Sequence, residues 1–336
     1  MIKTDIIIIG AGPVGLFSAF EAGLMKLKCH FIDSIPYPGG QLSEIYPKKP
    51  IYDIPGFPEI MAEDLVKNLM EQVSPFKPGF TLGDRVETIS KHKNGVFTVK
   101  TKQGTIHKAP IVFIAGGLGC FEPRKPKVPN LEFFEDNGVY YFVREPNFFV
   151  NKRIFISGGG DTALDWAIYF AERTKTKVGL IHRSESFRAQ KASVDKLYKL
   201  KEKGKIDLYA YSEVTNLEGE KSLTKITINN NNNNNQIIET LDCWLPLFGL
   251  SPKLGPISNW GLNIDKSSIS VNNLDYQTNI AGIFAIGDIN TYDGKLKLIL
   301  CGFHEATLAV QSAYKILFPN KNVILKYTTI QGIQGF

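Results

Sequence analysis

Cysteine is scarce in this chain of 336 residues, and no two cysteines lie close together in the sequence. The four are Cys29, Cys120, Cys243 and Cys301, and they form no CxxC pair. This spacing excludes a redox dithiol of the common kind and a zinc knuckle. We interpret the cysteines as free thiols in a reducing compartment, which favours a cytoplasmic protein.

Long apolar runs are also missing. No stretch approaches the roughly 18 apolar residues of a membrane span, and the N-terminal run Ile6 to Ile9 is too short for a secretory signal. The net charge is +6, but the chain has no basic stretch interleaved with aromatic residues of the kind that binds nucleic acid. We therefore expect a soluble protein that uses neither membrane nor nucleic acid as a partner.

Two glycine-rich loops stand out against this background, each between an apolar strand and a helix. The first unit has a strand over 5–9, the loop Gly10-Ala11-Gly12-Pro13-Val14-Gly15, a helix over 16–25 and a strand over 28–32. The second has a strand over 153–157, the loop Gly158-Gly159-Gly160-Asp161-Thr162-Ala163, a helix over 164–173 and a strand over 177–181. Each is a complete βαβ unit, which predicts an α/β fold with two Rossmann-like dinucleotide-binding domains, each of three layers (ββα).

The first loop has the GxGxxG spacing of a dinucleotide site. Gly10 permits the tight turn, Gly12 lets a pyrophosphate approach the backbone, and Gly15 lets helix and strand pack closely. The N–H groups at the start of the helix then face the phosphates. Asp33 ends the next strand, where a carboxylate can accept hydrogen bonds from the ribose hydroxyls of an unphosphorylated adenosine. This combination predicts FAD.

The second loop, with Gly158, Gly160 and Ala163, has a basic counterpart of that acid. The strand ends on His182 and Arg183, and Arg188 follows five residues later. A carboxylate there would repel a 2′-phosphate, whereas arginine binds one bidentately. The second unit therefore predicts NADPH, and the competing interpretation is that these arginines are solvated surface charges.

The domain organisation follows from a third strand-to-glycine signal, which ends on Gly287 and Asp288. Asp288 could accept a hydrogen bond from the ribityl chain of a flavin, or it could be an ordinary turn residue. If it contacts the flavin, the chain must return to the first domain. We expect an FAD domain over 1–113 and 248–336, with an NADPH domain over 114–247 inserted into it. The asparagine run 229–235 is expected at the tip of a hairpin.

No cluster of acid, base or metal-binding side chains is recognisable. Hydride transfer from a nicotinamide to a flavin needs none, because the cofactor supplies the chemistry and the protein places the rings. We therefore expect an oxidoreductase whose catalysis is flavin-based.

The order of these motifs along the chain resembles that of a known protein family. The order GxGxxG, Asp33, Gly39-Gly40-Gln41, GxGxxA, His182-Arg183 and then 278–288 is similar to the thioredoxin-reductase-like flavoproteins. The segment 140–145, where thioredoxin reductases carry their CxxC, has no cysteine. The runs 50–55, 158–161 and 248–252 resemble the ferredoxin–NADP+ reductases of the thioredoxin-reductase type.

The resemblance implies FAD, NADP and ferredoxin or flavodoxin as partners, and a homodimer in which a C-terminal tail covers the flavin. It also implies flavin contacts beyond the motifs. These are Gln41, Tyr46 as a stacking ring, Val86 through its backbone at the adenine, Phe121, Asp288, Tyr327 as a covering aromatic, and Thr329 at the reactive edge.

The chain departs from the thioredoxin-reductase pattern at one position, and two other functions are open alternatives. Thioredoxin reductases have a second arginine where this chain has Ser184, which leaves Arg183 and Arg188 to select NADPH. The first alternative is an NADPH-dependent disulfide reductase, which the missing CxxC opposes. The second is a non-catalytic flavin-binding sensor, which the complete second loop opposes, because a sensor would not need NADPH.

Overall fold

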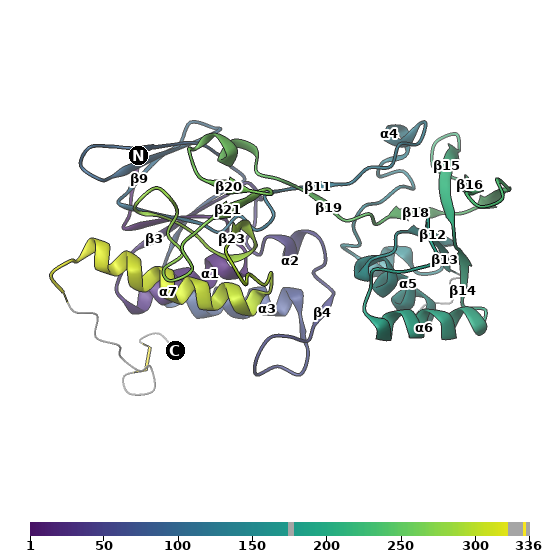
Figure 1. The fold of residues 1–336 in the computed structure, drawn as a ribbon, viewed down its shortest axis with the longest axis horizontal. Coiled ribbons are helices and arrows are strands. Elements are labelled where there is room, and N and C mark those ends of the chain that lie inside the picture. Colours follow the sequence, from purple (N-terminus) through teal and green to yellow (C-terminus); the bar gives the residue numbers. More distant parts are fainter. Residues whose placement is uncertain (174–177, 322–331, 334–336) are drawn as a thin grey trace. The chain divides into compact units, whose positions relative to one another are not determined.

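The structure is a computed structural model that describes residues 1–173, 178–321 and 332–333, without the side chains of 120–122 and 250–252. It divides into two units, one made of Met1–Cys120 with Pro252–Phe336 and the other of Phe121–Ser251 (Figure 1). The first boundary lies after the expected residue 113 because strand β10, Ile111–Ile114, pairs on both sides within the first unit.

A five-stranded parallel sheet forms the centre of the first unit. Its strand order is β22-β10-β2-β3-β6. The strands are β2 (Ile6–Ile9), β3 (Cys29–Asp33), β6 (Gly79–Leu82), β10 and β22 (Ile283–Ala285). Successive side chains of a strand point to opposite faces, and all four residues of β2 are buried. The sheet therefore requires cover on both faces.

Helices cover one face of this sheet, and a second sheet covers the other. Ile6 and Ile8 pack against α1 (Pro13–Leu24), α3 (Ala62–Val73) and α7 (Ile299–Leu317), which Figure 1 shows on one side of the strands. Ile7 and Ile9 pack toward the sheet β1-β9-β8-β7. Its strands are β1 (Ile2–Lys3), β7 (Val86–Lys91), β8 (Phe97–Thr101) and β9 (Ile106–Ala109).

The second unit repeats this three-layer arrangement. Its parallel sheet has the order β14-β13-β12-β18, with β12 (Ile154–Ser157), β13 (Val178–Ile181), β14 (Ile206–Tyr209) and β18 (Cys243–Pro246). One face packs against α5 (Asp161–Arg173) and α6 (Lys191–Glu202). The other packs against β15 (Ser212–Glu218), β16 (Lys225–Asn230) and β17 (Gln236–Thr240). The predicted pair of three-layer Rossmann-like domains is confirmed.

Shorter elements connect these layers. They are α2 (Gln41–Glu44), α4 (Leu131–Phe134), β4 (Pro50–Ile51), β5 (Ile60–Met61), β11 (Cys120–Pro123), β19 (Leu250–Lys253), β20 (Ile264–Asp265), β21 (Ser268–Ser270), β23 (Asn290–Thr291) and the 3₁₀ turns Ser74–Phe76, Pro146–Phe149, Gly255–Asn259 and Gly287–Ile289. Strands β11 and β19, which carry the chain out of the first unit and back, pair with each other.

The asparagine run forms the hairpin between β16 and β17, as predicted, although Asn229 and Asn230 still belong to β16. In the turn, the side chain of Asn230 accepts from the Asn232 N–H at 3.0 Å, and that of Asn233 accepts from the Asn235 N–H at 3.0 Å. Asparagine forms such local turns readily, so a run that cannot build a core can still close a hairpin.

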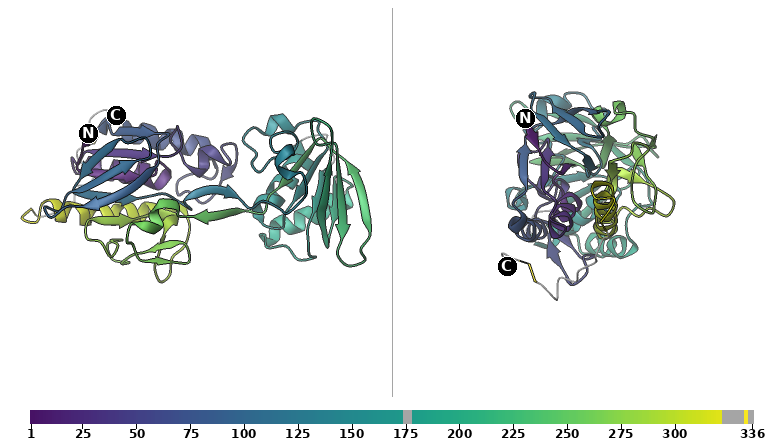
Figure 2. Two further views of the ribbon diagram at one scale, coloured as in Figure 1. Left: turned by 90° about the horizontal axis from the view of Figure 1, so that it is seen from above. Right: turned by 90° about the vertical axis from the view of Figure 1, so that its left-hand side faces the viewer.

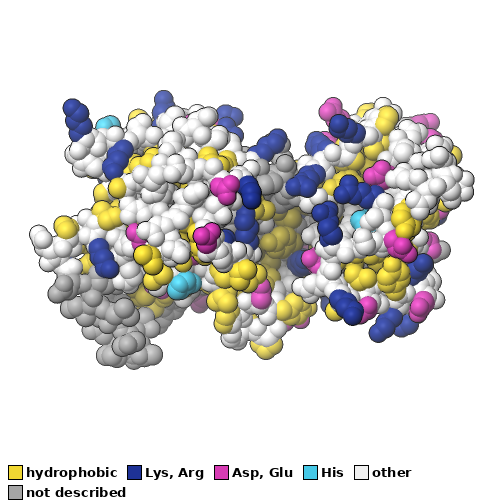
Figure 3. All heavy atoms as spheres, in the orientation of Figure 1, with side chains coloured by type: hydrophobic (Ala, Val, Ile, Leu, Met, Phe, Trp, Pro, Cys, Tyr) yellow, Lys and Arg dark blue, Asp and Glu magenta, His cyan; other side chains and the backbone are white. Residues whose placement is uncertain are grey.

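Two surface properties bear on partners. In the described part of the chain, no helix has both the length and the apolar character that crossing a membrane requires. On the face drawn in Figure 3, Lys and Arg side chains are spread over both units among acidic and neutral ones. The excess positive charge is therefore not gathered into one stripe on this face.

A buried histidine pair lies between the two sheets of the first unit. His30 Nε2 on β3 is 2.8 Å from Thr81 Oγ1 on β6, which is 3.0 Å from His107 Nε2 on β9. Burial, followed by the neighbouring His107, lowers the pKa of His30 to about 4. Burial also lowers the pKa of His107, against the opposing effect of Asp84.

This pair is expected to make the stability of the protein depend on pH. Above pH ~6.5 both histidines are neutral whether the chain is folded or unfolded. As the pH falls from ~6.5 toward 4, both histidines become protonated in the unfolded chain, whereas their lowered pKa values keep them neutral in the folded chain. The free energy of unfolding therefore falls by about 2 kcal/mol. Urea unfolding at pH 8, 6 and 5 measures this, and His30→Gln with His107→Gln should flatten the dependence. Exposed His92→Gln serves as the control, and an equal flattening by it would contradict the assignment.

Candidate functional site

The glycine loop of the first unit lies between β2 and α1, and two of its glycines are needed for different reasons. Gly10 has φ +108°, and a Cβ added there would lie 2.3 Å from the carbonyl oxygen of Ala115. Gly12 has φ −73°, which any residue adopts, and an added Cβ would meet nothing within 4 Å. The protein's own packing therefore explains Gly10, whereas the open space at Gly12 fits a ligand that lies against the backbone.

Asp33 is tied to this loop. Its carboxylate accepts from the Ala11 N–H at 2.7 Å and from the Ile35 N–H at 2.9 Å. Burial raises its pKa, and these N–H groups partly offset the rise. The acid predicted to bind an adenosine ribose therefore lies directly beside the predicted pyrophosphate loop.

Segments from both ends of the chain meet at the start of α1. A Cβ added at Gly302 of α7 would lie 2.3 Å from Val14 Cγ2, and one at Gly287 would lie 3.3 Å from the same atom. Figure 2 shows α1 and α7 side by side, seen nearly end-on in its right-hand view. The fold thus brings the Gly287–Asp288 turn to the first glycine loop, although 272 residues separate Asp288 from Leu16 in the sequence.

Tyr46 and Asp288, both predicted flavin contacts, lie close enough for the charge of Asp288 to act on Tyr46. Burial, followed by the charges of Asp288 and Asp53, raises the pKa of Tyr46 to about 12. Burial also raises the pKa of Asp288, while Lys295 and Lys297 act in the opposite direction. Gln41 begins α2, and its Nε2 is 3.7 Å from a Cβ placed on Gly117 in the loop after β10. Tyr46 and Asp288 are therefore neighbours, and Gln41 lies beside the loop that follows β10.

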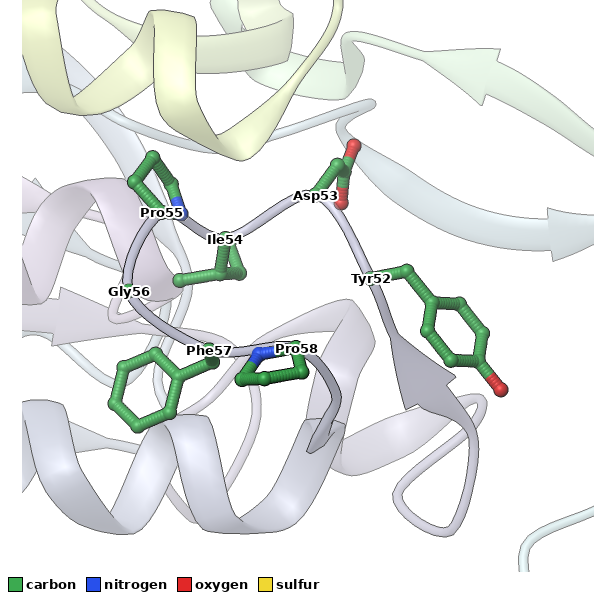
Figure 4. Close-up of a pocket in the computed structure, with 7 residues that line it drawn as sticks. All are labelled: Tyr52, Asp53, Ile54, Pro55, Gly56, Phe57 and Pro58. Carbon is green, nitrogen blue, oxygen red and sulfur yellow. The ribbon is translucent and has the colours of Figure 1, made fainter.

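The loop between β4 and β5 forms a hollow on the surface of the first unit (Figure 4). It is lined by Tyr52, Asp53, Ile54, Pro55, Gly56, Phe57 and Pro58. Ile54 is buried, whereas Tyr52 is 65% and Phe57 43% exposed. Since Asp53 also acts on Tyr46, this apolar surface lies close to the region that Tyr46 and Asp288 border.

The glycine loop of the second unit repeats the pattern of the first. A Cβ added at Gly158 would lie 2.6 Å from the Leu247 carbonyl oxygen, whereas one at Gly160 would meet nothing within 4 Å. Ala163, in the place of Gly15, is fully buried at the start of α5. This loop too has a closed side that packs and an open side that fits a ligand.

The predicted basic residues gather at this second loop. The His182 ring lies over Gly159 and stacks on Phe187 at 4.8 Å between ring centroids. The Arg188 N–H donates to the Gly159 carbonyl at 2.7 Å. Burial lowers the pKa of His182, and the charges of Arg183 and Arg188 lower it further. Both arginines are exposed, so a phosphate can reach them.

Not every predicted contact can be placed. Val86 is buried at the start of β7, where it pairs with Thr101. Phe121 lies in β11, but its side chain is outside the described part of the structure, and Tyr327 and Thr329 lie outside the described residues. Their roles stay predictions.

Sequence reasoning missed two groups of residues at these loops. Asp161 in the first turn of α5 accepts from the Gln190 N–H at 2.8 Å and so ties the 188–190 segment to the glycine loop. Glu305 and Lys295 form a buried ion pair beside Asp288. The available signal for Glu305 was a single acid in the otherwise apolar or neutral first half of α7.

A family model and curated relatives both match nearly the whole chain. The model of the family "Pyridine nucleotide-disulphide oxidoreductase" matches residues 4–313. A protein of Christiangramia forsetii named ferredoxin–NADP reductase 1 is 58% identical over 338 residues, covering 100% of this chain and 96% of the relative. A ferredoxin–NADP reductase of Flavobacterium johnsoniae is 59% identical over 337 residues, covering 100% and 95%.

Solved structures agree on the fold. The thioredoxin reductase of Lactococcus lactis in its FR conformation is similar with a TM-score of 0.80 and 25% identity, covering 94% of this chain and 100% of that one. The thioredoxin reductase of T. acidophilum has the same TM-score at 22% identity, covering 95% and 100%. This second likeness bears on the fold alone.

Proposed function

The chain belongs to the pyridine nucleotide-disulphide oxidoreductase family, and we propose that it is a ferredoxin–NADP+ reductase that transfers electrons between NADPH and ferredoxin or flavodoxin. The observation that carries this proposal is that relatives of that name match the whole chain at up to 59% identity. The open space at Gly12 and Gly160 supports it, because each loop has room for a dinucleotide.

The first unit holds FAD in this proposal. The backbone at Gly12 and the first turn of α1 receive the pyrophosphate, Asp33 receives the ribose hydroxyls, and Asp288 receives the ribityl or pyrophosphate region. Tyr46 places its ring along the cofactor, and Gln41 and the Val86 backbone complete the site. When bound, FAD supplies the step between two-electron hydride transfer and one-electron delivery.

The second unit holds NADPH. The backbone at Gly158, Gly160 and Ala163 receives its pyrophosphate, and His182, Arg183 and Arg188 receive its 2′-phosphate. Asp161 keeps Arg188 beside the loop through Gln190. The task of this unit is to bind and orient, since hydride transfer to a flavin needs no protein acid or base.

The resemblance to ferredoxin–NADP+ reductases of the thioredoxin-reductase type adds four details to this proposal, which concern Phe121, the C-terminal tail, the oligomeric state and the compartment. Phe121 lies near the flavin. Tyr327 and Thr329 of the tail cover its reactive edge. The tail acts on the flavin of a second subunit, so that the protein is a homodimer. It works in the cytoplasm, where its cysteines stay free.

Disulfide reduction is the competing function, because the similar solved structure from Lactococcus lactis is a thioredoxin reductase. A reductase of that type needs a pair of cysteines close together. Of the four cysteines of this chain, the nearest two in sequence are Cys243 and Cys301, and Cys243 is buried on β18. Burial raises the pKa of the Cys243 thiol to about 11, which leaves little reactive thiolate at neutral pH.

The visible spectrum tests the proposed function. The purified protein is expected to show bound flavin, and anaerobic NADPH is expected to bleach it. Added ferredoxin should then support cytochrome c reduction, whereas thioredoxin and low-molecular-weight disulfides should not be reduced. A colourless protein that takes up no FAD would overturn the proposal, and reduction of a disulfide without ferredoxin activity would favour the competing function.

A further inference from the structure

A carboxylate with no exposed surface lies beside the candidate flavin site and has no part in the proposed function. Glu305 in the second turn of α7 is 0% exposed, and its partner Lys295 has a side chain that is 6% exposed. Removing two charges from water is costly, and a buried ion pair is therefore weak evidence of added stability. Its best-attested use is to select one arrangement among several.

Four donors converge on the Glu305 carboxylate. Oε2 accepts from the Gly287 N–H at 2.7 Å and from Asn290 Nδ2 at 2.8 Å. Oε1 accepts from the Tyr292 hydroxyl at 2.9 Å and from the Lys295 ammonium. Lys295 also donates to the Gly287 carbonyl at 3.0 Å. The ion pair therefore holds both backbone polar groups of Gly287.

The side-chain amide of Asn290 donates to Glu305, but among the described residues its own oxygen is left without a hydrogen bond. Its Nδ2 donates to Glu305 and, at 2.9 Å, to the Ala285 carbonyl. Its Oδ1 is buried and has no partner in the described part of the structure. Buried acceptors are normally satisfied, so the amide is oriented to donate to Glu305 at the cost of its own oxygen.

The turn that these contacts hold has little freedom. Gly287 has φ +78° and packs on Val14 of α1, whose Cγ2 lies 3.3 Å from an added Cβ. The next residue is Asp288, whose charge helps to raise the pKa of Tyr46. A shift of the turn would move the Asp288 carboxylate relative to the first glycine loop.

We propose that Glu305 and Lys295 are positioning residues that hold the Gly287–Asp288 turn in the geometry that binds FAD. This inference rests on the proposed function, since it assumes that Asp288 contacts the flavin cofactor. Glu305 does not touch the cofactor in this proposal. It acts through Gly287, and its effect on FAD should therefore depend on Asp288.

The test measures FAD binding to apoprotein by flavin fluorescence in Glu305→Gln, Glu305→Ala, Asp288→Asn and the double variant Asp288→Asn/Glu305→Gln. Glu305→Ala loses all four contacts and is expected to raise the FAD dissociation constant about tenfold or more, which corresponds to ~1.4 kcal/mol. Glu305→Gln keeps an oxygen for the Gly287 N–H and should have a smaller effect. If Glu305→Ala does not fold, the FAD dissociation constant of Glu305→Gln decides the test, because glutamine has nearly the same size as glutamate.

Val310→Ala is the matched control. Val310 lies on the same helix and is fully buried in the same core, so its truncation lowers the melting temperature without touching the Glu305 contacts. Its FAD dissociation constant should stay within about twofold of wild type. An FAD affinity that falls equally in Val310→Ala and Glu305→Ala would overturn the inference, because the loss would follow stability alone.

The double variant separates positioning from general support. If Glu305 acts through Asp288, the double variant binds FAD about as weakly as Asp288→Asn alone. Effects that multiply would overturn the inference and leave the proposed function standing. A wild-type protein that binds no FAD would overturn both.

Discussion

Gly12→Val is expected to remove FAD from the protein while the fold persists. A Cβ added at Gly12 meets no protein atom within 4 Å and the φ of Gly12 is ordinary, so the fold should tolerate a side chain there that a pyrophosphate against the backbone does not. Losing two charge-assisted hydrogen bonds of ~1.5–3 kcal/mol each weakens FAD binding by about 100-fold or more. A valine at the start of α1 costs the fold about 1 kcal/mol. The absorbance of the purified protein and its circular dichroism measure the two effects.

Gly160→Val is the matched control for that change. It places the same side chain at the corresponding position of the second loop, where an added Cβ also meets nothing within 4 Å. This variant should keep its flavin spectrum but resist bleaching by NADPH, whereas dithionite should still reduce it. A Gly160→Val protein that loses flavin, or a Gly12→Val protein that keeps it, would contradict the assignment of the two loops.

Arg183→Ala with Arg188→Ala is expected to abolish the preference for NADPH over NADH. In the proposed site, each exposed guanidinium would contribute a charge-assisted contact of ~1.5–3 kcal/mol to the 2′-phosphate. Together they account for about 10²–10⁴-fold in kcat/KM for NADPH. The value for NADH should hardly change, because NADH lacks that phosphate. Steady-state kinetics with both cofactors measure the ratio.

Lys199→Ala controls for net charge in this experiment. Lys199 is an exposed cation on α6 of the same unit, and its loss should leave the cofactor preference unchanged. If the arginine double variant retains its selectivity, or if Lys199→Ala loses as much, the basic cluster is a solvated surface and does not select the cofactor.

The motifs of both sites could be predicted from the sequence because their spacing is local. A four-residue run of isoleucine followed by GxGxxG can satisfy its backbone and bury its side chains in few ways other than strand, turn and helix. The position of Asp33 follows from the length of that βαβ unit. The same holds for His182 and Arg183 in the second unit, whose gathering at Gly159 needs only one strand, one loop and one helix.

Other features depend on pairing between distant segments, which residue patterns within one window do not encode. The boundary after Cys120 follows from β10 pairing with β2 and β22. Lys295 and Glu305 are only ten residues apart, but the sequence shows them as two separate charges, because their pairing depends on how α7 packs against the Gly287–Ile289 turn.

The chain's pattern of residues therefore determines the two glycine-rich βαβ units, the acidic residue beside one and the basic residues beside the other, and the α/β class, because each arises within about 30 consecutive residues. The tertiary structure decides which distant residues share a site. Asp288 reaches the first unit's centre because β22, which precedes it, pairs with β10 in the parallel sheet. Glu305 holds Gly287 because α7 packs against the Gly287–Ile289 turn. The burial of the Glu305 carboxylate is explained by its four hydrogen-bond donors, which come from residues 287 to 295.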